Sequence, residues 1–236
     1  MITLAKFLAI SGIILPMLPH KNLIPDINLT PYSIWLATVV VSGISYLSYL
    51  LKRYVFHESG VLVSGIIGGL YSSTATISVL ARKSRKASEQ EANEYVAAML
   101  LAVSMMFLRF MILILIFSRE IFTSIYPYLL IMSVVAAVVA WFIHSRHRRS
   151  KDMTDESEDE DSSNPLEFKV ALIFATLFVV FTVLTHYTLV YAGTGGLNLL
   201  SFVSGLSDIT PFILNLLQNT GSVAVLVVVA CSMQAI

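Results

Sequence analysis

The sequence has little cysteine and little charge. Cys231 is the only cysteine among 236 residues, so an intramolecular disulfide and a cysteine-based metal site are both excluded. Charged residues make up only 13% of the chain and apolar residues 56%, which excludes a soluble globular protein. Phosphate-binding loops, zinc motifs and nucleophile elbows are also lacking. We therefore expect no enzyme activity, catalytic residue, metal site, cofactor or nucleic-acid partner.

Apolar windows of about 20 residues recur along the chain, as bilayer-spanning helices require. They predict an all-α integral membrane protein with about eight hydrophobic helices, at residues 2–18, 32–51, 61–81, 94–118, 121–143, 168–192, 196–217 and 221–236. The last segment would rise only about 24 Å as a helix, less than the roughly 30 Å hydrocarbon core. We expect that this helix is truncated or does not cross completely.

One long polar stretch divides the chain. Residues 145–166 begin with basic residues and then become acidic and serine-rich. This composition predicts a charged, disordered linker between a first membrane half, 1–144, and a second, 167–236. If all eight segments span, nine basic residues outside them lie on the linker's side of the membrane and three on the other. The excess places the linker in the cytoplasm.

A short motif occurs twice, at a separation of 136 residues. Gly69-Leu70-Tyr71-Ser72-Ser73-Thr74 lies within 60–82, and Gly205-Leu206-Ser207-Asp208-Ile209-Thr210 lies within 195–217. Glycine and hydroxyl residues that interrupt a helix at membrane depth are tolerated where they are buried in protein or line a cavity. Paired interrupted segments in two halves point to a transporter's binding site. The motifs predict two internal repeats, each containing a broken helix.

The topology of the motif segments is open at this stage. If both segments span the membrane, the repeats are parallel; if both enter and return, the repeats are inverted and the basic residues divide ten against two. Counting basic residues cannot separate these topologies, because both put the linker in the cytoplasm. Of the two, we favour spanning but broken helices.

Each motif offers residues for a binding site. In the first, glycines precede hydroxyls that can cap a renewed helix, whose N-terminus favours an anion. In the second, Thr210-Pro211 fits an N-cap followed by proline, and Asp208 favours a cation or proton. The alternative for both motifs is tight helix packing by small residues. The predicted substrate-binding residues are Gly68, Gly69, Ser72, Ser73, Thr74, Thr76, Arg109, Ser204, Gly205, Asp208 and Thr210.

Arg109 is a charge deep within an apolar segment. Such a residue usually faces the interior of a helix bundle and is paired. The other deeply placed charge is Asp208, so we expect an ion pair between the two, or a contact from Arg109 to carbonyls of a motif. The alternative is that Arg109 snorkels or joins helices, while Asp208 caps a half-helix near water. His186, Tyr187 and Tyr191 are predicted to lie at a membrane interface.

Several stretches resemble one family over nearly the whole chain. They are Leu15-Pro16-x-Leu18-Pro19, Gly68 to Thr76, Met106-x-x-Arg109, Asn164-Pro165-x-Glu167 and Ser204-Gly205-Leu206-x-Asp208. The family is the uncharacterised domain found C-terminal to MgtC/SapB domains in prokaryotic membrane proteins. The resemblance implies a multi-pass protein of the prokaryotic cytoplasmic membrane, with an MgtC/SapB domain as a partner. Its loose link to magnesium homeostasis belongs to the MgtC/SapB domain and does not assign magnesium transport here.

Two functions fit these observations. The first is a permeation or transport module for an ion or small solute, with its site where the repeats meet. The alternative is a non-transporting scaffold or regulatory subunit that binds a partner membrane protein or a second copy of the chain through small-residue faces. Transport predicts a polar cavity at the motifs, and scaffolding predicts a dry packed interface.

Overall fold

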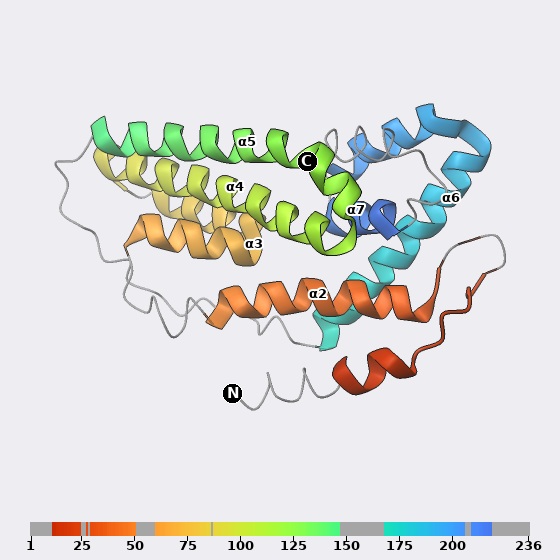
Figure 1. Cartoon of the computed structure of the whole chain (residues 1–236). Helices are drawn as coiled ribbons and strands as arrows, with labels where there is room; N and C mark the ends of the chain where they lie inside the picture. Colours follow the sequence, from red (N-terminus) through yellow and green to blue (C-terminus); the bar gives the residue numbers. More distant parts are fainter. Residues whose placement is uncertain are drawn as a thin grey trace. The chain divides into compact units, whose positions relative to one another are not determined.

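The structure is a computed structural model that describes residues 11–24, 27, 29–50, 60–85, 87–146, 168–205 and 209–218. The regular elements of this part of the chain are helices, which confirms the all-α class (Figure 1). A helical stretch at residues 11–17 precedes the longer helices. These are α2 (Pro31–Leu50), α3 (Val61–Ser84), α4 (Glu89–Phe117), α5 (Arg119–Arg146), α6 (Phe168–Gly205) and α7 (Ile209–Gln218). The predicted final segment, 221–236, and the predicted linker beyond Arg146 lie outside the described residues.

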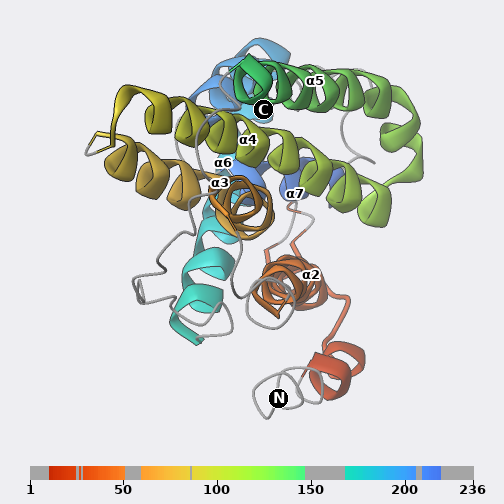
Figure 2. The same cartoon turned by 90° about the vertical axis from the view of Figure 1, so that its left-hand side faces the viewer.

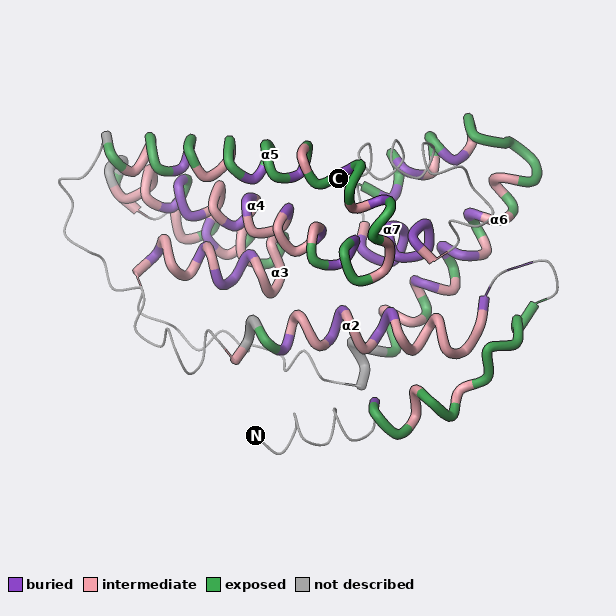
Figure 3. The backbone as a smooth tube through the Cα atoms, viewed as in Figure 1, coloured by how far each residue is buried: buried purple, intermediate pink, exposed green. Residues whose placement is uncertain are grey.

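Within the described residues, four helices are long and apolar enough to cross a membrane. They cover Val61–Ser84, Glu91–Phe117, Arg119–Ser145 and Leu172–Gly205, and shorter apolar helices cover Pro31–Leu47 and Ile209–Gln218. On α5, large apolar side chains are exposed along most of the helix, for example Ile131 at 60% and Trp141 at 68% (Figure 3). Such a surface is stable where lipid tails, not water, surround it.

The chain forms two compact units. Unit 1 comprises Met1–Ser42, Leu113–Ile125 and Leu166–Ile236, and unit 2 comprises Gly43–Ile112 and Tyr126–Pro165. Helices α2, α4 and α5 each continue from one unit into the other. The first motif lies in unit 2 and the second in unit 1, so each motif is described within its own unit.

In unit 2, α4 and α5 pack against each other as antiparallel neighbours. In the chain, Ser118 of unit 1 alone separates the two helices, and its hydroxyl accepts a hydrogen bond from Ile121 N at 3.4 Å. Ser104 Oγ donates to Ser133 O at 2.9 Å, and Ser133 Oγ donates to Ser104 O at 3.1 Å. These reciprocal bonds join α4 and α5 directly, because small hydroxyl residues let the two backbones approach closely.

The most consequential feature of unit 2 is that α3 folds back on itself. Ser72 has non-helical torsion angles, φ −157° and ψ 103°, and it divides α3 into two arms. Val61 in the first arm and Leu80 in the second belong to one buried cluster with Tyr95 and Ala98 of α4. In a straight helix, about 28 Å would separate Val61 from Leu80. The two outer ends of α3 therefore lie together.

The contacts of the first arm give its direction. A side chain at Gly65 would meet the main chain of Ala98, and one at Gly69 would meet the main chain of Ala102. Both helices advance by four residues between these contacts, so the first arm runs parallel to α4. Only residues 85–88 connect α3 to α4, so the second arm must return toward the start of α4. Figures 1 and 2 show the two arms of α3 out of line with each other.

The two arms bear on the topology of the first motif, for which the sequence favours a spanning, broken helix over a segment that enters and returns. An extended residue at Ser72 reverses the chain instead of continuing it. Each arm rises only about 17 Å, roughly half the hydrocarbon core. The hairpin agrees with a segment that enters and returns, and the topology of α3 in the membrane stays a prediction.

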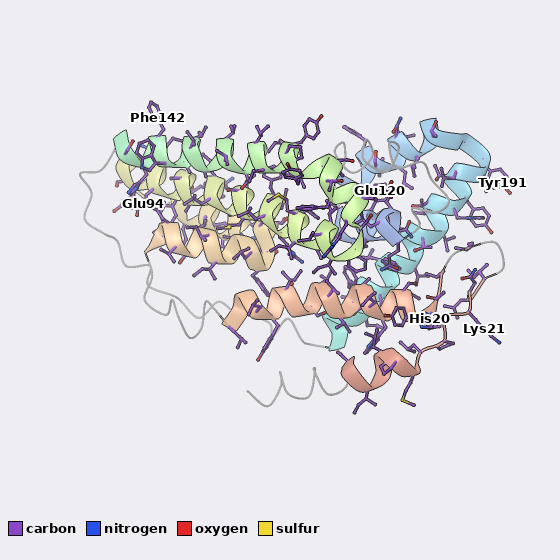
Figure 4. The ribbon with its side chains drawn as sticks, viewed as in Figure 1. His20, Lys21, Glu94, Glu120, Phe142 and Tyr191 are labelled. Carbon is purple, nitrogen blue, oxygen red and sulfur yellow. The ribbon has the colours of Figure 1, made fainter. Side chains whose placement is uncertain are left out.

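In unit 1, α6 is also interrupted. Gly193 has φ 59° and ψ −152°, at the place where the sequence predicts one segment to end at 192 and the next to begin at 196. Just before this break the rings of Tyr187 and Tyr191 stack with centroids 6.1 Å apart. Tyr191 is 82% exposed and points away from the helix in Figure 4. Exposed, stacked tyrosines are typical of a membrane interface.

Helix α7 packs against the middle of α6. Its residues from Thr210 to Leu217 are all buried (Figure 3). The ring of Phe212 lies edge-on to that of Phe181, with centroids 5.8 Å apart. The described part of the segment predicted at 196–217 belongs to α6 up to Gly205 and to α7 from Ile209. Ile209 and Thr210 are both helical, so Thr210 does not have the non-helical position of the predicted N-cap.

Candidate functional site

The candidate site is the tip of the α3 hairpin, and Ser72 shapes it. Ala75 N, which would bond to the carbonyl of Tyr71 in a continuous helix, instead donates to Ser72 Oγ at 3.4 Å. Ser72 therefore caps the second arm, as the sequence predicts for a hydroxyl of this motif. Because Ala75 N bonds to Ser72 Oγ, the carbonyl of Tyr71 can accept a hydrogen bond from a different donor.

Arg109 of α4 provides that donor. Its Nη1 donates to the carbonyl oxygen of Tyr71 at 3.0 Å, and its Nη2 lies 3.5 Å from Ser45 Oγ of α2. The guanidinium thus connects three helices of unit 2 at the hairpin tip. The predicted contact from Arg109 to a carbonyl of a motif is confirmed. A planar group with five donors suits this role better than a lysine would.

Glycines fit the hairpin against α4. A Cβ at Gly69 would lie 2.5 Å from Ala102 Cα and 2.7 Å from Ala102 O, and one at Gly65 would lie 2.9 Å from Ala98 Cα and closer still to Ala98 O. A Cβ at Gly68 would instead lie 2.8 Å from Thr76 Cγ2, across the break. Gly65 and Gly69 allow the first arm to approach α4, and Gly68 allows the second arm to approach the first.

The hydroxyl residues of the first motif differ in how far they are exposed. Ser72, Ser73 and Thr76 are half-buried, and Thr74 is exposed. Thr74 also accepts a hydrogen bond at its carbonyl from Ser78 Oγ at 2.8 Å. The tip therefore combines accessible hydroxyls, the N-terminal end of the second arm and the guanidinium of Arg109. These groups together favour polar ligands that carry acceptor atoms.

The second motif is organised differently. Ser204 is fully buried, and its Oγ donates to Ser201 O at 2.8 Å within α6. Gly205 is exposed at the end of α6, and Thr210 is buried in the first turn of α7. Asp208 lies outside the described residues, so its predicted ion pair with Arg109 stays a prediction. No group of three His, Cys, Asp or Glu side chains within the described residues could hold a metal ion.

The sequence does not identify every residue of these contacts. It indicates Arg109 and a motif carbonyl, but neither Tyr71 as the acceptor nor Ser45 as the second partner. In unit 1 it misses Asn215, which is fully buried and donates through Nδ2 to Thr182 Oγ1. The available signal was an amide side chain between apolar residues, since such a group requires a hydrogen-bond partner when it is buried.

The fold and the site define a class of protein. Long apolar helices, two of them interrupted by non-helical residues, make this chain a multi-pass helical membrane protein. Residues 39–236 match a family described as a domain of unknown function, DUF4010, and the chain belongs to this family.

One similar protein comes from Aquifex aeolicus (strain VF5) and is described as an uncharacterized protein. It is 26% identical over 168 residues, which cover 70% of this chain and 71% of that protein. No solved structure matches the chain.

Proposed function

We propose that this protein is a membrane permeation or transport module for an ion or small solute, and that the α3 hairpin lines its path. The observation that carries the proposal is the fold-back of α3 at Ser72, with Arg109 bound to the carbonyl beside it. Irregular backbone at membrane depth is tolerated where it lines a cavity or is buried in protein. Two arms of about 17 Å bring such a tip to roughly the middle of the hydrocarbon core.

The topology of the proposal follows from the hairpin. Both ends of α3 then face one side of the membrane, so Lys52 and Arg53 before it and the basic residues 82–86 after it face that side together. The basic residues then divide ten against two, which orients this face and the linker 145–166 toward the cytoplasm.

In the proposed architecture the second motif is the counterpart of the first. The second motif carries glycine and hydroxyl residues like the first, and its residues 206–208 lie outside the described part of the chain. If the second motif enters from the opposite face, the two halves are inverted repeats, an arrangement found in many transporters. Arg109 and Asp208 then set selectivity or gating where the repeats meet. The site would use Gly68, Ser72, Ser73, Thr74, Thr76 and Ser204, besides the two charged residues.

A scaffold is the second candidate function. It is favoured by the close approach of Gly65 and Gly69 to α4, since such contacts also serve helix association alone. The exposed apolar surface of α5 would then bind a partner membrane protein, such as one with an MgtC/SapB domain, or a second copy of the chain.

A flux measurement on the purified protein in proteoliposomes tests the proposal. The panel covers protons, alkali cations, divalent cations and anions. We expect flux of one class, reduced at least tenfold by Arg109→Gln and altered in selectivity by Asp208→Asn. Arg119→Gln is the matched control, because Arg119 is exposed at the start of α5. The absence of flux for every solute, with a membrane partner co-purifying, would reject transport and support the scaffold.

A labelling experiment tests the topology separately. In a Cys231→Ser background, single cysteines replace Gly60 and Ser84, at the two ends of α3. A membrane-impermeant thiol reagent should label both positions from the cytoplasmic side of oriented vesicles. Labelling from opposite sides would reject the re-entrant topology.

A further inference from the structure

A second group of buried polar side chains lies in unit 1, where α6 and α7 pack together. Thr182 and Thr185 are one turn apart on α6 and are 2% and 3% exposed. Asn215 and Gln218 are one turn apart on α7, and Asn215 is fully buried. The hydrogen bond from Asn215 Nδ2 to Thr182 Oγ1 joins the two pairs. We call these four residues the α6–α7 polar cluster.

Thr185 Oγ1 and Gln218 Oε1 belong to the cluster and are both buried. Neither atom has a hydrogen-bond partner among the described residues. Gln218 uses its Nε2 to donate to Ser33 O at 3.3 Å, so its oxygen is left over. A buried polar atom without a partner costs about 1–3 kcal/mol, and a bound ligand or water is the usual explanation.

The behaviour of Thr185 differs from that of its neighbours. Thr176 and Thr182 each donate to the carbonyl four residues earlier, at 2.8 Å in both cases. Thr185 makes no such bond, although it lies in the same helix. Its hydroxyl oxygen is therefore available to a ligand in a place from which water is largely excluded.

The chemistry of the cluster selects the ligand. All four side chains are uncharged, and Gln218 Oε1 can only accept, so the ligand must supply a positive charge or a donor. Divalent cations prefer carboxylate ligands, whereas sets of neutral oxygens suit alkali-metal cations.

We infer that the α6–α7 polar cluster binds a partly dehydrated alkali-metal cation through Thr185 Oγ1 and Gln218 Oε1. The inference goes beyond the proposed permeation function, because its ligand is a cation, whereas the groups at the tip of the α3 hairpin favour ligands that carry acceptor atoms. It also gives unit 1 a binding role that does not depend on Asp208.

Thermal unfolding of the purified full-length protein tests the inference. The unfolding temperature is measured in Li⁺, Na⁺, K⁺ and Rb⁺ chloride against N-methylglucamine chloride at constant ionic strength. A cation that binds only the folded state raises this temperature in a saturable way. We expect at least one alkali cation to do so. Equal unfolding temperatures in all five salts would overturn the inference without any variant.

Variants locate the ion. Thr185→Val preserves the shape of the side chain and removes the oxygen, so it should weaken the apparent affinity at least tenfold, as should Gln218→Leu. Thr185→Ser keeps the hydroxyl and should bind nearly as tightly as the wild type. Thr176→Val is the matched control, because Thr176 is exposed on the same helix. Unchanged affinity in both Thr185→Val and Gln218→Leu would overturn the inference.

Flux and binding separate the two proposals. Alkali-cation binding at the cluster without flux in proteoliposomes supports the ion site and rejects permeation. If Thr185→Val leaves the flux unchanged and alkali cations leave the unfolding temperature unchanged, permeation is supported and the ion site is rejected.

Discussion

Two of the described helices are each broken at one residue, and the backbone conformation at the break differs between them. In α3 the folding residue is Ser72, whose φ of −157° is extended backbone that any residue adopts. In α6 it is Gly193, whose φ of 59° with ψ of −152° is accessible almost only to glycine. The first fold must therefore be maintained by contacts around it, and the second by the backbone at the residue itself.

The surroundings of the two positions agree with this difference. The α3 hairpin has a capping hydroxyl, an arginine on the adjacent carbonyl and two glycines pressed against α4. At Gly193 a Cβ would meet nothing within 4 Å, so packing imposes no requirement for glycine there. Substitutions in the two regions should therefore differ in size and in cause.

The largest expected effect is at Gly69. Gly69→Ala places a Cβ 2.5–2.7 Å from main-chain atoms of Ala102, which cannot move independently of α4. The arm and α4 must separate, and we expect a loss of about 3 kcal/mol in the free energy of unfolding. Thermal unfolding in detergent measures it. Gly195→Ala is the control in the other region, where a Cβ has no neighbour within 4 Å. Similar losses in both variants would contradict the packing role of Gly69.

The next effect is at Gly193. Gly193→Ala introduces no clash but forces a side chain into a backbone conformation that only glycine adopts readily. The expected loss is about 2 kcal/mol in the free energy of unfolding. Gly195→Ala, two residues later in the same helix, should be neutral or slightly stabilising, because alanine favours helix. An unchanged unfolding temperature in Gly193→Ala would show that the break at this position is not fixed by its torsion angles.

A smaller loss is expected at Arg109. Arg109→Gln replaces the charged donor to the Tyr71 carbonyl with a neutral one, so we expect a loss of about 1.5 kcal/mol, the low end for hydrogen bonds to charged groups. Arg109→Lys should be intermediate, because one ammonium cannot reproduce the planar fork that reaches both Tyr71 O and Ser45 Oγ. Arg119→Gln, at an exposed position, should leave the unfolding temperature unchanged. A lysine variant as stable as the wild type would show that the contact to Ser45 contributes nothing.

The sequence predicts much of the fold because bilayer helices have a strong apolar signal. The segments predicted at 94–118 and 121–143 correspond to α4 and α5, which extend further only where polar residues at their ends continue the helix. The break before residue 196 is predictable because Gly193, Gly195 and Gly196 weaken helix there.

The fold-back of α3 is not predictable in the same way. Its direction depends on Gly65 and Gly69 meeting Ala98 and Ala102, which are contacts between helices and leave no periodic signal in one segment. For the candidate site, burial cost predicts that Arg109 needs a partner. That partner is the Tyr71 carbonyl, which can accept from Arg109 because Ser72 Oγ accepts the hydrogen bond from Ala75 N instead. Composition does not reveal this local exchange of acceptors.

The smallest expected effect, at Ser72, completes the contrast with Gly193. Ser72→Ala removes the acceptor for Ala75 N but leaves torsion angles that alanine adopts without strain. The loss should be about 0.5–1 kcal/mol, and Ser72→Asn, which can cap, should recover most of it. Ser78→Ala is the control, since its hydroxyl only donates back to Thr74 O on an exposed surface. If Ser72→Ala destabilised the protein as strongly as Gly193→Ala, both folds would depend on the folding residue itself. A small loss would instead mean that the glycine contacts and Arg109 maintain the hairpin, and with it the tip through which we propose that solute passes.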